Sequence, residues 1–177
     1  MADIVNLALS SLTIAGQIII VYLALVILIR KKNHPLFGKP FRWIESHGLT
    51  FALIVALIAT LGSLTFSDVL GYEPCKLCWW QRIFMYPQAI VLATGIYLKD
   101  LKVWITAIAL SSIGACFSIY HILIQSGIVG PSGACATAGV SCAKIDFMAL
   151  GWITMPIMCL SLFVGILSFS YISHRKN

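Results

Sequence analysis

The sequence predicts an all-α protein, a multi-pass bundle of transmembrane helices, and three observations support this fold class. Hydrophobic residues make up 60% of the 177 residues and charged residues only 10%, whereas soluble domains carry about a quarter charged residues. Five stretches are long and apolar enough to cross a bilayer. Most of the basic residues lie at the ends of these stretches. Such a chain cannot cover a water-facing surface, but it can face lipid.

The five predicted spans cover residues 7–29, 49–67, 79–98, 103–125 and 152–172. All five should be helices, because a backbone in lipid must satisfy its own hydrogen bonds. No basic residue precedes the first stretch, and its apolar core is longer than that of a signal peptide. We therefore expect a permanent first helix.

The charge of the connections indicates the orientation. Nine of the 12 Lys and Arg residues lie in the segment 30–48, in the turn between the third and fourth spans, and in the C-terminal tail. The positive-inside rule places these segments in the cytoplasm, so the N-terminus lies outside and the C-terminus is cytoplasmic. The net charge of +6 then reflects topology and contact with anionic lipid headgroups. We predict no nucleic-acid partner.

Four of the six cysteines form two close pairs outside the spans, Cys75/Cys78 and Cys135/Cys142. Two spans separate the connections that carry them, so both pairs lie on the same side of the membrane. The charge rule makes this the extracytoplasmic side, which is oxidising and lets disulfides persist.

The first pair is a C-x-x-C motif, Cys75-Lys76-Leu77-Cys78, at the predicted start of the third helix. A disulfide closing so short a loop adds little chain-entropy stabilisation, so the pair suits redox cycling better than stapling. A helix N-terminus favours a thiolate. Arg82 lies one helical turn after Cys78 and would depress its pKa. We therefore expect the reactive thiolate at Cys78, and Arg82 could also stabilise a quinone anion.

In the second pair, Cys135 lies within the glycine-rich segment 127–139 and Cys142 follows it. We expect a flexible outer loop whose disulfide is accessible to the thiol of a partner protein. Electrons would then pass by exchange to Cys75 and Cys78. Because side chains cannot store two electrons turn after turn, a cofactor must remove them, and a quinone in the bilayer fits this location.

Other interpretations of these residues stay open. Two structural disulfides in a non-enzymatic membrane protein would also account for the pairs. A zinc site made of all four outer cysteines is less compatible with the spacing of the second pair, and we predict no metal. Arg82 could be a side chain that reaches the membrane interface, and His121 a polar residue near the end of a span. The spans contain almost no other charge, which disfavours a channel or transporter.

The segment EPCKLCWWQRIFMYP at 73–87, followed by the second pair in the next outer loop, resembles the DsbB family of disulfide-bond formation proteins. The similarity is greatest to the small BdbC-type branch, and the segment SIYH at 118–121 is also similar. The resemblance covers roughly residues 48–172. It implies a four-helix core that reoxidises a DsbA-like thioredoxin-fold partner and passes electrons to a membrane quinone, either ubiquinone or menaquinone.

The resemblance also implies a role for each cysteine. Cys135 would form the mixed disulfide with the partner, and Cys142 would then exchange with Cys75. Cys78 would face the quinone. Arg82 and His121 match positions that line the quinone site of the family, so both are expected to bind the cofactor.

Two features depart from the family pattern. The chain has an additional span at its N-terminus, and its second pair has fewer intervening residues than in the best-known proteobacterial members. An enzyme similar to vitamin K epoxide reductase is a further alternative, but there the C-x-x-C comes late and the loop pair early, the reverse of the order here. We expect a protein of the bacterial cytoplasmic membrane with four segments: an additional N-terminal helix (1–30), a cytoplasmic linker (31–48), the four-helix core (49–172) and a cytoplasmic tail (173–177).

Overall fold

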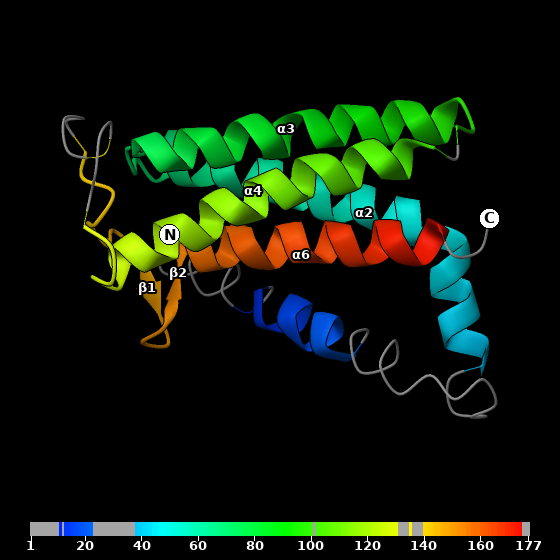
Figure 1. Cartoon of the computed structure of the whole chain (residues 1–177), viewed down its shortest axis with the longest axis horizontal. Helices are drawn as coiled ribbons and strands as arrows, with labels where there is room; N and C mark the ends of the chain where they lie inside the picture. Colours follow the sequence, from blue (N-terminus) through cyan, green and yellow to red (C-terminus); the bar gives the residue numbers. More distant parts are fainter. Residues whose placement is uncertain are drawn as a thin grey trace.

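Four helices run side by side in the computed structural model and form a bundle (Figure 1). They are α2 (Gly38–Leu64), α3 (Lys76–Tyr97), α4 (Val103–Gln125) and α6 (Met155–His174). α3 and α6 each pack against both α2 and α4. The predicted all-α bundle is thereby confirmed. The structure describes residues 11, 13–22, 38–100, 102–130, 135 and 140–174.

Two smaller elements lie at one end of the bundle. The π-helix η2 (Thr65–Val69) continues α2. A short hairpin precedes α6, and each of its strands, β1 (Met148–Ala149) and β2 (Ile153–Thr154), has two residues. The hairpin is antiparallel, with Met148 opposite Thr154. Because β2 occupies Ile153–Thr154, the last helix begins at Met155 and not at residue 152 as predicted.

Three helices in the described part of the chain are long and apolar enough to cross a membrane, namely Ser46–Val69, Val103–Gln125 and Met155–His174. α3 is not among them, because its Gln, Arg and Trp residues lower its mean hydropathy. Its 22 residues nearly match the 23 of α4, and it packs along α4. The fold is that of a membrane protein in which α3 is the most polar helix of the bundle.

The N-terminal region differs in detail from the expectation. Of the predicted span 7–29, the structure describes an apolar helix over Thr13–Tyr22, termed the N-terminal helix below, and the other residues of that span lie outside the described part apart from residue 11. The expected linker, 31–48, is helical from Gly38 onward. At His47 the backbone leaves helical geometry and α2 kinks.

Small residues let the helices approach closely. Ala52, Ala56 and Ala59 of α2 and Ala107 of α4 belong to the main apolar core together with Phe163 of α6. Helices in a membrane commonly associate through small residues. Lipid tails are as apolar as the side chains, so close van der Waals packing has to favour helix contact over lipid contact. Between α4 and α6 there is no spare room, since a Cβ atom on Gly114 would collide with the ring of Phe163.

We predict that Gly114→Ala lowers stability by about 1–3 kcal/mol, the usual cost of overpacking a filled core. The added methyl group has to displace the Phe163 ring, which is fully buried. The measurement is the midpoint of thermal unfolding in detergent. Gly130→Ala is the matched control, because a Cβ atom there meets nothing within 4 Å. Equal midpoints for the two variants would contradict the packing described here.

Candidate active site

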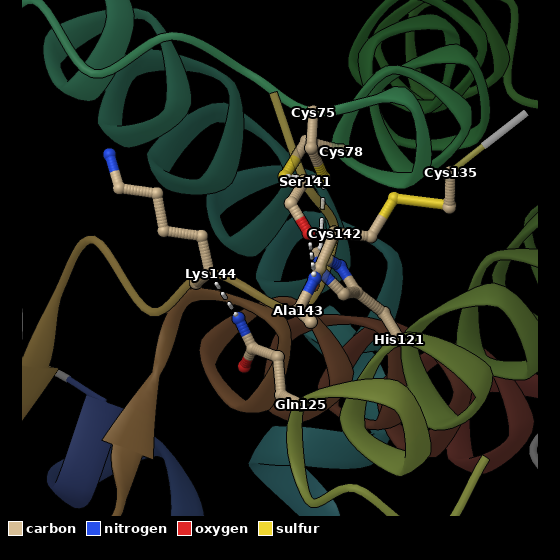
Figure 2. Close-up of a disulfide and its surroundings, with 9 residues drawn as sticks. All are labelled: Cys75, Cys78, His121, Gln125, Cys135, Ser141, Cys142, Ala143 and Lys144. Carbon is tan, nitrogen blue, oxygen red and sulfur yellow. Dashed lines mark hydrogen bonds between the residues drawn. A yellow bond between two sulfur atoms is a disulfide. The ribbon is translucent and has the colours of Figure 1, made fainter. Parts of the chain in front are cut away.

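Both cysteine pairs lie at the same end of the bundle, as the parity of the spans predicts. Cys75, Cys135 and Cys142 are buried in one apolar cluster with Leu77 of α3 and Ile124 of α4. Cys78 packs against this cluster. Figure 2 shows the four cysteines around His121. Two connections that are far apart in sequence therefore converge on one small site.

The C-x-x-C pair sits where α3 begins. Cys75 is the N-cap residue and has an extended backbone, whereas Cys78 lies in the first turn of the helix. Both are free thiols, and their sulfur atoms are 3.3 Å apart. The first N–H groups of a helix have no partner within it, so this position favours negative charge.

His121 of α4 contacts both pairs. Its Nε2 atom is 3.1 Å from the backbone oxygen of Cys142 and 3.7 Å from the Sγ atom of Cys75. A carbonyl oxygen only accepts hydrogen bonds, so Nε2 must carry the proton and donate it. The same N–H can then donate to Cys75 only if the sulfur accepts. The Nδ1 atom is buried and has no hydrogen-bond partner in the part of the chain that the structure describes.

These contacts stabilise a thiolate at Cys75. The sulfur atoms of Cys75 and Cys78 share a hydrogen bond, and His121 adds a second hydrogen bond to Cys75. Together they outweigh burial, which opposes the charge, and lower the pKa of Cys75 from 9.0 to about 4. The expectation of a thiolate at Cys78 is wrong in this structure, because the pKa that is lowered is that of Cys75, which also contacts His121.

Arg82 does not contact the cysteine sulfurs through any hydrogen bond that the described residues show. Its guanidinium donates to the backbone oxygen of Ser63 at 3.2 Å and lies over the ring of Trp79, 5.3 Å from the centroid. Tyr86 donates to the Ser63 hydroxyl at 3.1 Å. These contacts fix the guanidinium between α2 and α3, one helical turn after the C-x-x-C motif.

Cys135 and Cys142 are joined by a disulfide. The expectation that it is exposed on a flexible loop is wrong for the two cysteines, which are 6% and 0% exposed. Both belong to the buried cluster that also contains Cys75, Leu77 and Ile124. Of the glycine-rich segment 127–139, residues 131–134 and 136–139 lie outside the described part. A zinc site made of four thiolates is not formed, since two of the four cysteines bind each other.

Three potential metal ligands do lie together. The ligand atoms of Cys75, Cys78 and His121 are within 4.8 Å of one another. The same spacing lets the two sulfurs form a disulfide and the imidazole donate to one of them. The arrangement thus allows redox chemistry as well as metal ligation.

A cavity of about 320 Å³ adjoins the site. Its polar end is lined by Cys75, Cys78, Gln81, Arg82 and His121, and the remainder is mostly apolar. Gln81 is 3% exposed, and its Nε2 atom has no partner. Gln81 lies three residues after Cys78, which puts it on the same face of α3. Its place in the sequence is thus compatible with contact to the cofactor, and the burial of its amide is visible only in the fold.

A membrane-embedded helical bundle with two cysteine pairs next to an apolar cavity defines a thiol–disulfide oxidoreductase of the membrane. The family of disulfide bond formation protein DsbB matches residues 45–173. The chain belongs to this family and is a membrane oxidoreductase that forms disulfides. No solved structure is significantly similar to it.

Three relatives illustrate the similarity. Probable disulfide formation protein C 1 of Bacillus anthracis is 38% identical over 128 residues, which are 72% of this chain and 92% of the relative. The SPbeta prophage-derived disulfide bond formation protein B of Bacillus subtilis is 39% identical over 71% of this chain and 85% of its own. A probable disulfide formation protein of Metapseudomonas resinovorans is 36% identical over 75% of this chain and 96% of the relative.

We predict that the Cys75 thiol titrates at a pH far below that of an ordinary cysteine thiol. The folded-state pKa of about 4 lies below the ordinary 9.0, so Cys75 stays anionic as the pH falls to about 5 and becomes protonated only below about 4. The measurement is the ultraviolet absorbance of the thiolate as a function of pH, taken as the difference from Cys75→Ser. His121→Leu should move the midpoint upward because it removes one donor. A midpoint near 9 in the unmodified site would contradict the assignment.

Proposed function

We propose that this protein is a protein dithiol:quinone oxidoreductase. It takes two electrons from the dithiol of a DsbA-like thioredoxin-fold partner and passes them, through its own cysteine pairs, to a quinone of the bacterial cytoplasmic membrane. One observation carries the proposal. The Cys75/Cys78 thiols and the Cys135–Cys142 disulfide meet in one buried cluster next to an apolar cavity.

The first exchange balances between partner and chain. A thiolate of the partner attacks Cys135, the Cys135–Cys142 bond breaks, and Cys142 leaves as a thiolate. The second thiol of the partner then attacks the mixed disulfide and releases Cys135. The partner now holds a disulfide and the chain a dithiol, so two electrons have moved.

The second exchange is internal. Cys142 attacks Cys75 of an oxidised Cys75–Cys78 pair, and Cys78 leaves. Cys135 then attacks the Cys75–Cys142 bond, which re-forms the Cys135–Cys142 disulfide and releases Cys75. The structure has the bonding of this end point, with the loop pair bonded and the C-x-x-C pair reduced. The His121 N–H, shared between Cys142 and Cys75, favours Cys75 as the leaving thiolate.

The Cys75/Cys78 pair closes its disulfide by losing two electrons and the proton of Cys78, because Cys75 is already a thiolate. A quinone bound in the cavity would supply the chemistry for this step, because a quinone accepts two electrons and two protons, and the second proton would come from solvent. The residues fit such a group. Gln81 Nε2 is a buried donor without a partner that could donate to a quinone oxygen, and His121 Nδ1 is a buried acceptor without a partner that could hold a proton.

We infer the orientation from charge. The nine basic residues at the other end of the spans place that end in the cytoplasm. Both cysteine pairs then lie on the extracytoplasmic side, where a secreted partner is accessible. The N-terminus is outside and the C-terminus inside.

The deciding experiment is quinone reduction by the purified protein in detergent. We expect reduction of a ubiquinone- or menaquinone-type acceptor that depends on a reduced thioredoxin-fold partner. Cys78→Ser should abolish it, because the C-x-x-C pair can no longer close. Cys116→Ser is the matched control and should retain activity, since Cys116 is an exposed cysteine of α4 that belongs to neither pair. A folded protein that reduces neither quinone type would refute the proposal.

Gln81→Leu separates quinone binding from thiol exchange. We expect the KM for quinone to rise about threefold to tenfold, the equivalent of one lost neutral hydrogen bond. The single-turnover exchange between partner and Cys135–Cys142 should keep its rate, because Gln81 contacts neither cysteine through a hydrogen bond. Steady-state and single-turnover kinetics of the same preparation check both points. An unchanged KM would exclude Gln81 from the quinone site.

A further inference from the structure

The N-terminal helix, Thr13–Tyr22, lies outside the family match, which begins at residue 45. It nevertheless packs on the bundle. In Figure 1 it is the short blue helix alongside α6. Gln17 donates from Nε2 to the hydroxyl of Ser161 at 2.9 Å, and the side chain of Ile14 packs against the cluster of Phe66, Phe147, Ile153 and Met158. A helix with no counterpart in the family match is thus held at a defined position.

One face of this helix lines the same cavity as the redox cysteines. Thr13, Ala15, Gly16, Ile19 and Ile20 line it opposite residues of α2 and α6. Ile20 is close to α6, since a Cβ atom on Gly165 would lie 3.8 Å from its Cδ1 atom. Ile18 and Val21 do not line the cavity and are 64% and 58% exposed. The helix therefore has one face toward the cavity and another away from it.

The cavity changes in character along its length. Near the C-x-x-C motif it is lined by Gln81 and Arg82, and farther along α2 and α6 it is lined by apolar side chains. Those apolar residues are Ile54, Val55, Ile58, Leu162 and Phe169. A polar end next to the redox cysteines and an apolar continuation match a ligand with a polar ring and a long hydrocarbon tail.

We infer that the N-terminal helix is the wall of a channel for the apolar tail of the quinone, and that it selects acceptors by their tail. This inference rests on the proposed function and deepens it. The polar ring lies at Gln81 and Arg82, and the tail runs between the N-terminal helix, α2 and α6. Gly16 is the position where the wall has room, because a Cβ atom there meets nothing within 4 Å.

The test narrows the channel at Gly16 and compares two quinones. Gly16→Phe places a ring in the cavity, whereas Ile18→Phe, the matched control, places a ring on the exposed face of the same helix. Each variant is reconstituted in phosphatidylcholine vesicles with a quinone that carries either a long isoprenoid tail or no tail. We expect Gly16→Phe to raise the KM for the long-tailed quinone about tenfold, the scale of a steric change in an apolar pocket. The KM of Gly16→Phe for the tailless quinone should not change. The KM values of Ile18→Phe for the two quinones should not change either.

The outcomes separate this inference from the proposed function. If the unmodified protein reduces no quinone, the proposed function fails. If the unmodified protein is active and Gly16→Phe leaves the long-tailed KM unchanged, or raises both KM values equally, the helix is not the tail channel. Exchange of the Cys135–Cys142 disulfide with a reduced partner needs no quinone and should stay unchanged in both variants. Should Gly16→Phe fail to fold, Gly16→Leu tests the same wall.

Discussion

A thiolate buried at the end of an apolar bundle is stable only where hydrogen-bond donors meet it, because burying an unpaired charge is costly. In this chain the donors come from two helices. Cys78 reaches Cys75 from the first turn of α3, and His121 reaches it from α4. The contribution of His121 therefore depends on the packing of α3 against α4. The hydrogen bond from Ser111 to Gln88, 2.8 Å long and buried between the same helices, supports that packing.

His121 also distinguishes the two cysteines within each pair. It binds the backbone of Cys142 and the sulfur of Cys75, and the structure shows no such link from His121 to Cys135 or Cys78. In the proposed relay this asymmetry would favour exchange between Cys142 and Cys75 and leave Cys135 for the partner. Because Cys135 is almost fully buried here, a partner thiol has to displace packing around the disulfide before it can react. Access to the loop pair and transfer within the chain are therefore separate steps.

The cavity adjoins the redox cysteines and has a largely apolar lining. Near the C-x-x-C motif the cavity is lined by Gln81 and His121, each of which presents a buried atom without a hydrogen-bond partner among the described residues. Elsewhere apolar side chains predominate, so a lipid-soluble acceptor can be held without leaving polar groups unsatisfied. The N-terminal helix extends this apolar lining beyond the four-helix core. The chain thus adds to the family fold at the place where the acceptor would lie.

The sequence by itself determined the bundle, because stretches of about 20 apolar residues have no alternative to helices in lipid. It also determined that both cysteine pairs lie at one end, since an even number of spans separates them. Only the tertiary structure decided which thiol carries the charge. That depends on His121, 46 residues from Cys75, whereas sequence spacing alone pointed to Arg82 and Cys78. The burial of Cys135 and Cys142, the unpartnered amide of Gln81 and the placement of the N-terminal helix were likewise set by contacts between helices, which no local pattern encodes.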